Sequence, residues 1–190
     1  MRQYEGAGAK GYEAARRKQA KWQWEDATVR KVLATLGNEV QSVIDAPVGT
    51  GRFLDLYTMP AVGYDVSADM LDVARSLHEG AELHRLDLVT EALPTTADLV
   101  VSVRFLNLLD TPDALKALGH LLAAARKYAL FTLRTVAEGY IGSYSVGRVR
   151  LHCDWEMLCA IGAAGFEVVE RHSFPDNVPG LYDIILVRRS

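Results

Sequence analysis

Short apolar runs alternate regularly with segments of helical periodicity along most of the chain. Five apolar runs, each of a length typical of a buried strand, are separated by stretches whose apolar residues recur every three or four positions. Strands that alternate with helices form parallel sheets covered on both faces, so this order predicts an α/β fold with a doubly wound sheet. The five predicted strands are residues 42–46, 61–66, 81–86, 98–103 and 128–133.

The end of the chain departs from this alternation. Residues 166–174 and 182–188 are two further predicted strands, separated only by residues 175–181. A parallel crossover needs about a dozen or more residues, so these two strands must pair antiparallel. The sequence therefore predicts a seven-stranded, mostly parallel doubly wound sheet with a C-terminal antiparallel β-hairpin.

Start and stop signals place the helices between these strands. Residues 11–36 read as an amphipathic helix, interrupted near Asp26 and Thr28 and ended by Gly37. Ser67 is a plausible N-cap of the helix after the second strand, and we expect Thr111 to cap a later helix with Pro112 in its first position. Further helices are predicted at residues 52–57 and 152–164, and a mobile loop or flap at residues 138–150.

Composition narrows the class of protein. The chain has 190 residues, 49% of them hydrophobic and 24% charged, with a formal net charge of −3. This fits one compact globular domain and gives no overall basic field for nucleic acid. No apolar run approaches the roughly 20 residues that span a bilayer, and residues 1–10 lack the apolar core of a secretory signal, so we expect no membrane partner.

Cysteine and histidine usage indicates no metal site. Cys153 and Cys159 are predicted to lie in one helix, at a spacing that suits neither a disulfide nor a metal. The five histidines are scattered without the spacing of zinc ligands. We therefore predict no metal, interpret both cysteines as buried packing groups, and expect a reducing, cytoplasmic compartment.

Glycines and carboxylates gather where three consecutive strands end. Gly49 and Gly51 follow the first strand, where bare backbone allows a tight turn and the close approach of a ligand. Asp65 closes the second strand, where a carboxylate can accept hydrogen bonds from both hydroxyls of a ribose. Asp87 follows the third strand and can meet the amino group of an adenine. Together these residues predict a cradle for an adenosine-like ligand.

These segments resemble the ordered motifs of class I S-adenosylmethionine-dependent methyltransferases, which have a Rossmann-like fold. Residues 45–51 are similar to the first motif, D/E-x-G-x-G-x-G, residues 63–75 to the second, and residues 98–106 to the fourth-strand motif. The resemblance runs from Val43 to the C-terminus and includes the closing hairpin. It implies S-adenosylmethionine as cofactor, with Asp65 on the ribose and Met70 beside the adenine. The cofactor-binding residues that it implies are Asp45, Ala46, Pro47, Gly49, Gly51, Asp65, Val66, Met70, Asp87, Leu88 and Val103.

The sequence also departs from related patterns. Pro47 replaces the first glycine of the motif, which removes a backbone donor and stiffens the loop. Residues 103–107 lack the Asn/Asp-Pro-Pro-Tyr/Phe signature of amino-directed DNA base methylases, and neither cysteine is placed for cytosine-C5 or uracil-C5 chemistry. A dehydrogenase fingerprint fails because Leu54 stands where close helix packing needs a small residue.

Several of these residues keep a second interpretation. Asp45 supports the loop, with or without contact to the amino group of the donor. Met70 is either helix core or an adenine contact, and Asp87 could simply cap a turn. His152 is interpreted as a structural or capping residue rather than a general base, and no catalytic residue can be named.

The N-terminal segment, residues 1–37, is predicted as a helical unit attached to the methyltransferase domain of residues 38–190. Basic residues interleaved with aromatics there can bind nucleic acid, but we favour a solvated basic face whose aromatics pack on the domain. In the family that the sequence resembles, such a helix often covers the pocket for donor and acceptor, so the resemblance implies a lid here. The candidate acceptor contacts are Tyr12, Trp22 and Trp24 on this lid, and Arg104, Tyr140, Tyr144 and Arg148 elsewhere.

The function predicted from these features is methyl transfer to an oxygen or nitrogen of a small molecule. The reaction would be an in-line displacement accelerated mainly by positioning. The alternatives are an RNA or protein methyltransferase and a non-catalytic S-adenosylmethionine-binding module. The expected assembly is a monomer or homodimer.

Overall fold

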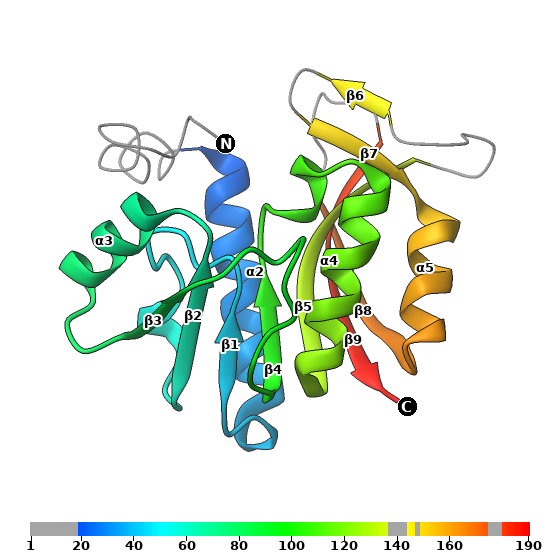
Figure 1. Cartoon of the computed structure of the whole chain (residues 1–190). Coiled ribbons are helices and arrows are strands. Elements are labelled where there is room, and N and C mark those ends of the chain that lie inside the picture. Colours follow the sequence, from blue (N-terminus) through cyan, green and yellow to red (C-terminus); the bar gives the residue numbers. More distant parts are fainter. Residues whose placement is uncertain (1–18, 137–143, 147–148, 175–179) are drawn as a thin grey trace.

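A central twisted sheet with helices on both faces forms the body of the protein (Figure 1). The computed structural model describes residues 19–136, 144–146, 149–174 and 180–190. Five strands run parallel in the order β3-β2-β1-β4-β5, which confirms the predicted doubly wound sheet. These strands are β1 Val43–Asp45, β2 Ala61–Asp65, β3 Glu82–Arg85, β4 Ala97–Ser102 and β5 Ala125–Val136.

The C-terminal strands form the predicted antiparallel hairpin. Strand β9 (Leu181–Arg189) lies between β5 and β8 (Phe166–Phe174) and pairs antiparallel with both. Two short strands were not predicted: β6 (Tyr144–Val146) pairs with β7 (Val149–Cys153), and β7 continues along the end of β5. Within the described residues the sheet therefore has nine strands, the seven expected ones and this small ladder.

The helices follow the prediction with several corrections. They are α2 Ala20–Leu36, α3 Ala68–Leu77, α4 Thr111–Ala124 and α5 Asp154–Ala163, with 3₁₀ turns η2 Gly37–Glu39, η3 Leu54–Leu56 and η4 Leu106–Leu108. Ser67 caps α3 as expected, because its hydroxyl accepts a hydrogen bond from the Met70 amide. The predicted interruption of α2 near Asp26 and Thr28 is wrong. Asp26 instead pairs with Arg30 one turn on, and Thr28 is buried against the domain.

Two helix starts lie at residues other than those expected. Asp110, not Thr111, is the N-cap of α4, since its carboxylate accepts from the Asp113 amide. Helix α5 begins only at Asp154, because His152 and Cys153 pair with the end of β5 as part of β7. The predicted helix at residues 52–57 is reduced to the single turn η3.

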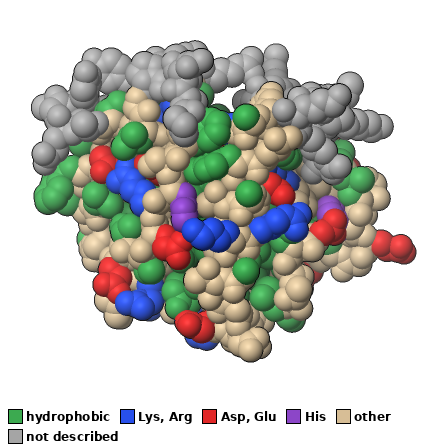
Figure 2. Space-filling model, turned by 180° about the vertical axis from the view of Figure 1, so that it is seen from behind, with side chains coloured by type: hydrophobic (Ala, Val, Ile, Leu, Met, Phe, Trp, Pro, Cys, Tyr) green, Lys and Arg blue, Asp and Glu red, His purple; other side chains and the backbone are tan. Residues whose placement is uncertain are grey.

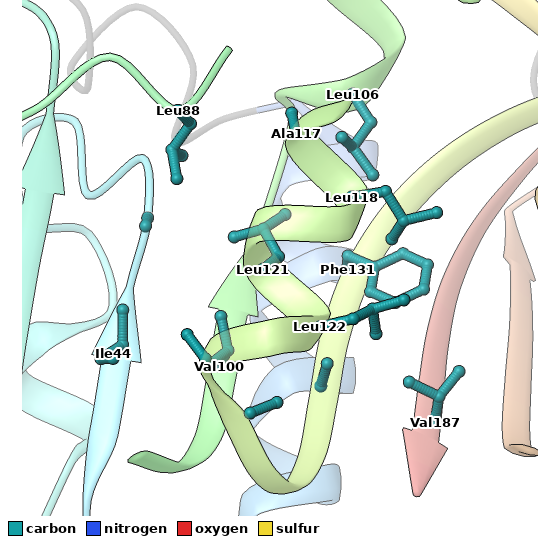
Figure 3. Packing of buried hydrophobic residues seen from close by; sticks show 14 of the residues in the cluster. Ile44, Leu88, Val100, Leu106, Ala117, Leu118, Leu121, Leu122, Phe131 and Val187 are labelled. Atoms are coloured by element: carbon teal, nitrogen blue, oxygen red, sulfur yellow. The ribbon is translucent and has the colours of Figure 1, made fainter. Parts of the chain in front are cut away.

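Neighbouring side chains of the central strands point into two apolar layers, one on each face of the sheet, as expected of a sheet buried on both faces. In β4, Val100 faces the layer under α4 and α5 (Figure 3), whereas Leu99 and Val101 face the layer under α2. Helix α2 joins the second layer through Val29 and Val32. This part of the predicted N-terminal segment is thus packed on the sheet. None of the helices described is both long and apolar enough to cross a membrane.

The apolar layer under α4 and α5 allows a direct test of the packing. Leu118 of α4 has no exposed surface and lies in the cluster that includes Phe131 (Figure 3). We expect Leu118→Ala to lower the free energy of unfolding by about 2–5 kcal/mol, because it removes buried methyl groups and leaves a cavity. Leu77→Ala, at a leucine that is 56% exposed, should change it by less than about 0.5 kcal/mol. Urea titrations of both variants measure the difference, and equal losses would contradict this core.

Candidate functional site

A cavity of about 260 Å³ opens at the carboxyl ends of β1, β2 and β4. This is the edge at which doubly wound sheets bind their ligands. It brings together nine of the residues predicted from sequence: Trp22, Asp45, Pro47, Gly49, Asp65, Val66, Met70, Val103 and Arg104. The remaining lining residues were not predicted: Val48, Thr50, Arg52, Phe53, Ser67, Phe105, Leu108 and Leu109.

The loop after β1 is shaped by its two glycines. Gly49 has a φ of 58° and donates its amide to Asp65 Oδ2 at 2.9 Å, which draws the loop toward the end of β2. Gly51, at a φ of 84°, does not line the cavity. A Cβ there would lie 2.6 Å from the ring of His78, so this glycine is needed for packing behind the loop.

Asp65 ties the ends of two strands together. Besides the Gly49 amide it accepts the Ser67 amide on Oδ1 at 2.8 Å, and its side chain is nearly buried. Burial raises the pKa of Asp65, and the amides of Ser67, Gly49 and Val66 hold that rise back. Each carboxylate oxygen keeps acceptor capacity beyond these bonds, so the group can still receive hydroxyls from a ligand.

Asp45, at the end of β1, is held differently. Its Oδ2 accepts a hydrogen bond from the Tyr57 hydroxyl at 3.0 Å, and only 2% of the residue is exposed. Burial raises its pKa to about 7. The Tyr57 bond and Arg52 act against that rise, and the charge of Asp65 adds to it. The cavity therefore contains two carboxyl groups in unlike environments.

Asp87 and Leu88, which follow the third strand, lie beside the end of β2 but do not line the cavity. The Leu86 amide donates to the Asp65 carbonyl, so the chain leaves β3 beside the end of β2. The Asp87 carboxylate accepts the Val89 amide at 3.0 Å and caps its own turn, as the second of its two interpretations predicts. Leu88 is buried in the apolar layer under α4 and α5. A role of Asp87 or Leu88 at an adenine stays a prediction.

Ala46 also belongs to the apolar layer under α4 and α5 and is fully buried. Its amide continues the β1–β4 pairing by donating to the Val101 carbonyl, and the Ala46–Pro47 peptide bond is cis. Met70 is 4% exposed and lines the cavity at the same time. Core packing and ligand contact are therefore compatible at this position.

A buried carboxylate on α2 organises the far wall of the cavity. Glu25 has no exposed surface and accepts hydrogen bonds from Arg52 at 2.7 Å, Arg104 at 2.8 Å and the Tyr182 hydroxyl at 2.6 Å. These donors come from the loop after β1, the end of β4 and β9. Sequence reasoning missed Glu25, although it shares the apolar face of the helix with Val29 and Val32. That position was the available signal.

Trp22 and Arg104 form this wall together with Arg52. The guanidinium carbon of Arg52 lies 3.5 Å from the centre of the Trp22 ring, and that of Arg104 lies 5.1 Å away. Arg104 has a φ of 61°, uncommon for a residue with a side chain, and its amide donates to Thr132 Oγ1 at 2.7 Å. A strained backbone beside a cavity is typical of a functional position.

The other predicted acceptor contacts lie elsewhere. Trp24 packs against Phe174 and Tyr182, at ring-centre distances of 5.2 and 6.2 Å, and is not part of the cavity lining. Tyr144 belongs to β6, where its backbone pairs with Leu151, but its side chain is not among those that the structure describes. Tyr12, Tyr140 and Arg148 lie outside the described residues.

His152 and the cysteines have structural surroundings. His152 is fully buried between Thr111 Oγ1 at 3.2 Å and the Leu106 carbonyl at 3.0 Å, and burial lowers its pKa. This agrees with a structural role. Both cysteines are free, but the expectation that both are buried is wrong, because Cys159 is exposed on α5. Among the described residues there is no cluster of three His, Cys, Asp or Glu side chains that could hold a metal.

Comparison with known proteins identifies the class of fold. No protein-family model and no curated protein matches the sequence. Among solved structures, magnesium protoporphyrin IX methyltransferase (ChlM) from Synechocystis PCC 6803, with bound SAH, is similar at a TM-score of 0.71 and 19% identity, over 100% of this chain and 98% of that one. CalS10, an amino pentose methyltransferase from Micromonospora echinaspora with bound SAM, gives 0.71 and 21%, over 94% and 96%. DesVI from Streptomyces venezuelae gives 0.73 and 19%, over 96% and 99%. The chain therefore has the Rossmann-like fold of class I methyltransferases.

The Glu25 cluster leads to a stability prediction. We expect Glu25→Gln to lower the free energy of unfolding by about 3–5 kcal/mol, because it leaves two guanidinium groups without their shared counter-charge. Asp72→Asn, at an exposed ion pair on α3, is the control. It should cost at most about 1 kcal/mol, because Asp72 and its partner Arg75 are both largely exposed. Denaturant unfolding of both variants decides, and a loss in Glu25→Gln no larger than the control's would argue against the cluster.

Proposed function

We propose that this protein is an S-adenosylmethionine-dependent methyltransferase that acts on an oxygen or nitrogen of a small molecule. The observation that carries the proposal is the pairing of Gly49 and Asp65 at one cavity. Bare backbone lets a ligand approach the loop, and the carboxylate beside it can accept both hydroxyls of a ribose. The fold supports the proposal, since the structures it resembles include methyltransferases with bound SAM or SAH.

The residues present fit such a cofactor. The ribose would be held by Asp65 and the adenine side lined by Val66 and Met70, all three of which border the cavity. When bound, the cofactor supplies a methyl group already activated on a sulfonium. The remaining task of the protein is to position the acceptor and to exclude water.

The acceptor side of the cavity is mainly apolar. Phe105, Leu108 and Leu109, which follow β4, line the cavity, as does Trp22. The two positive charges of Arg52 and Arg104 are opposed by the buried Glu25 and by Asp26, which lies 4.0 Å from Arg52, so this wall carries little excess charge. A small acceptor with an apolar body suits it. His152 does not border the cavity, so it is not placed there as a general base.

Nucleic acid is the less favoured acceptor. Lys21, the described member of the basic N-terminal group, lies 3.3 Å from the centre of the Tyr182 ring. Figure 2 shows acidic and basic side chains interspersed over the described part of one face of the molecule. The net charge of −3 adds no attraction for a polyanion. A cytoplasmic monomer or homodimer completes the proposal.

Ligand binding is the first test. We expect calorimetry to detect binding of S-adenosylmethionine and of its demethylated product, and none of nicotinamide dinucleotides, because the glycine pattern lacks the small residue that the dinucleotide fingerprint requires. Binding of NAD but not of S-adenosylmethionine would refute the assignment.

Asp65 is the residue whose loss should matter most. We expect Asp65→Ala to weaken S-adenosylmethionine binding at least about tenfold, since it removes charge-assisted hydrogen bonds to the ribose as well as the support of Gly49. Asp72→Ala, at an exposed aspartate of α3, should leave the affinity unchanged. Unaltered affinity in the Asp65 variant would remove the main support for the proposal.

The acceptor can be found by transfer of a labelled methyl group to mixtures of small molecules, with RNA and protein as parallel arms. Label in the small-molecule arm is the expected result. Label only in RNA or protein would overturn that part of the proposal. Binding without label in any arm would favour the non-catalytic module.

A further inference from the structure

Two carboxyl groups line one small, largely apolar cavity, and they receive different hydrogen-bond donors. Asp65 receives two backbone amides on separate oxygens, at 2.8 and 2.9 Å. Asp45 receives the phenol of Tyr57 on Oδ2. Backbone amides held in a turn stabilise an ionised carboxylate strongly, whereas a single phenol does so less. The negative charge of the pair is therefore stabilised better at Asp65 than at Asp45.

The charged groups around Asp45 leave this balance in place. Asp65 faces it from β2 and opposes its ionisation. Arg52, from the same loop, favours ionisation, but its guanidinium is bonded to Glu25 and to the Trp22 carbonyl. Tyr57 stays a donor, because burial and the nearby Asp45 raise its pKa well above the usual value. With burial raising the pKa of Asp45 to about 7, this carboxyl exists in both protonation states near neutral pH.

The proposed donor and its product differ in charge at one atom. The donor carries a positive sulfonium, and the demethylated product has a neutral thioether in its place. A cation in a cavity of low polarity favours the ionised form of a neighbouring acid. The step balances as a carboxylic acid going to a carboxylate with one proton released to solvent, and it reverses when the positive charge is lost.

This inference rests on the proposed function. We propose that the Tyr57–Asp45 pair couples donor binding to proton release: the cationic donor binds with loss of a proton from Asp45, and the neutral-sulfur product does not. The site thereby distinguishes donor from product by charge, and Tyr57 acts as the positioning residue that holds Asp45 toward the cavity.

Calorimetry in two buffers of different ionisation enthalpy measures the protons released on binding, with S-adenosylmethionine and S-adenosylhomocysteine as probes. If bound donor lowers the pKa of Asp45 by about one unit, about half a proton should be released near pH 6.5, and donor affinity should rise about fivefold between pH 6 and pH 8. The product should show a smaller release and a flatter profile.

Two variants separate this coupling from the titration of the amino groups of the ligands. Asp45→Asn should abolish the extra proton release and flatten the pH profile for the donor. Tyr57→Phe should move the rise in affinity to higher pH, because the ionised carboxylate loses its donor. The matched control is Tyr128→Phe, because the Tyr128 hydroxyl donates to Glu39 and not to a residue of the cavity. This variant should keep the wild-type profile.

The outcomes are distinguishable. If the wild type binds neither probe, both the proposed function and this inference fall. If it binds both with equal proton release, or if Asp45→Asn retains the excess release for the donor, the inference is wrong while the proposed function stands. If Asp45→Asn does not fold, the shift in Tyr57→Phe decides, and a profile identical to that of Tyr128→Phe overturns the coupling.

Discussion

The architecture around the cavity depends on the neutralisation of one buried charge. An isolated carboxylate such as that of Glu25 would cost several kcal/mol to bury, so the fold must bring cations to it. Arg52 and Arg104 come from the ends of two parallel strands, and Tyr182 comes from the antiparallel strand β9. One side chain of α2 thus fixes the relation of the helix to the carboxyl edge of the sheet. The wall that contains Trp22 is a consequence of that docking.

Asp65, the residue that we propose as a ribose contact, also supports the backbone around it. Asp65 holds the loop after β1 through the Gly49 amide and begins the turn into α3 through the Ser67 amide. A side chain fixed on two sides has little conformational entropy left to lose, so the ribose contact that we propose for Asp65 would cost little ordering. Pro47 restricts the same loop covalently. The loop and the carboxylate at which we propose that a nucleoside binds are therefore held together by contacts within the chain.

The sequence allowed prediction of what is periodic or local. Strand β4 is a continuous apolar run in the sequence, which is typical of a strand whose neighbouring residues, such as Leu99 and Val100, are buried in opposite layers. The link between the last two strands is so short that they must pair antiparallel. Asp65 could be placed because a strand end is a local feature. The position of Glu25 on the apolar face of α2 was a local signal, but its partners are 27, 79 and 157 residues away in the chain and no local pattern identifies them. His152 was assigned to a helix because its apolar surroundings fit either structure, and only the pairing with Thr135 makes it a strand residue.

The two cavity aspartates illustrate why site chemistry is harder to predict than site location. Both stand at strand ends, and although the sequence predicts different roles for them, it does not show which hydrogen-bond donors each receives. Their difference arises from the donors that the tertiary structure provides, two amides for one and a phenol for the other. Tyr57 reaches Asp45 because the helix expected after Gly51 shrinks to the single turn η3, which brings the following residue back toward the end of β1. A departure from the regular fold at this one helix therefore determines which carboxyl group can respond to the charge of a ligand.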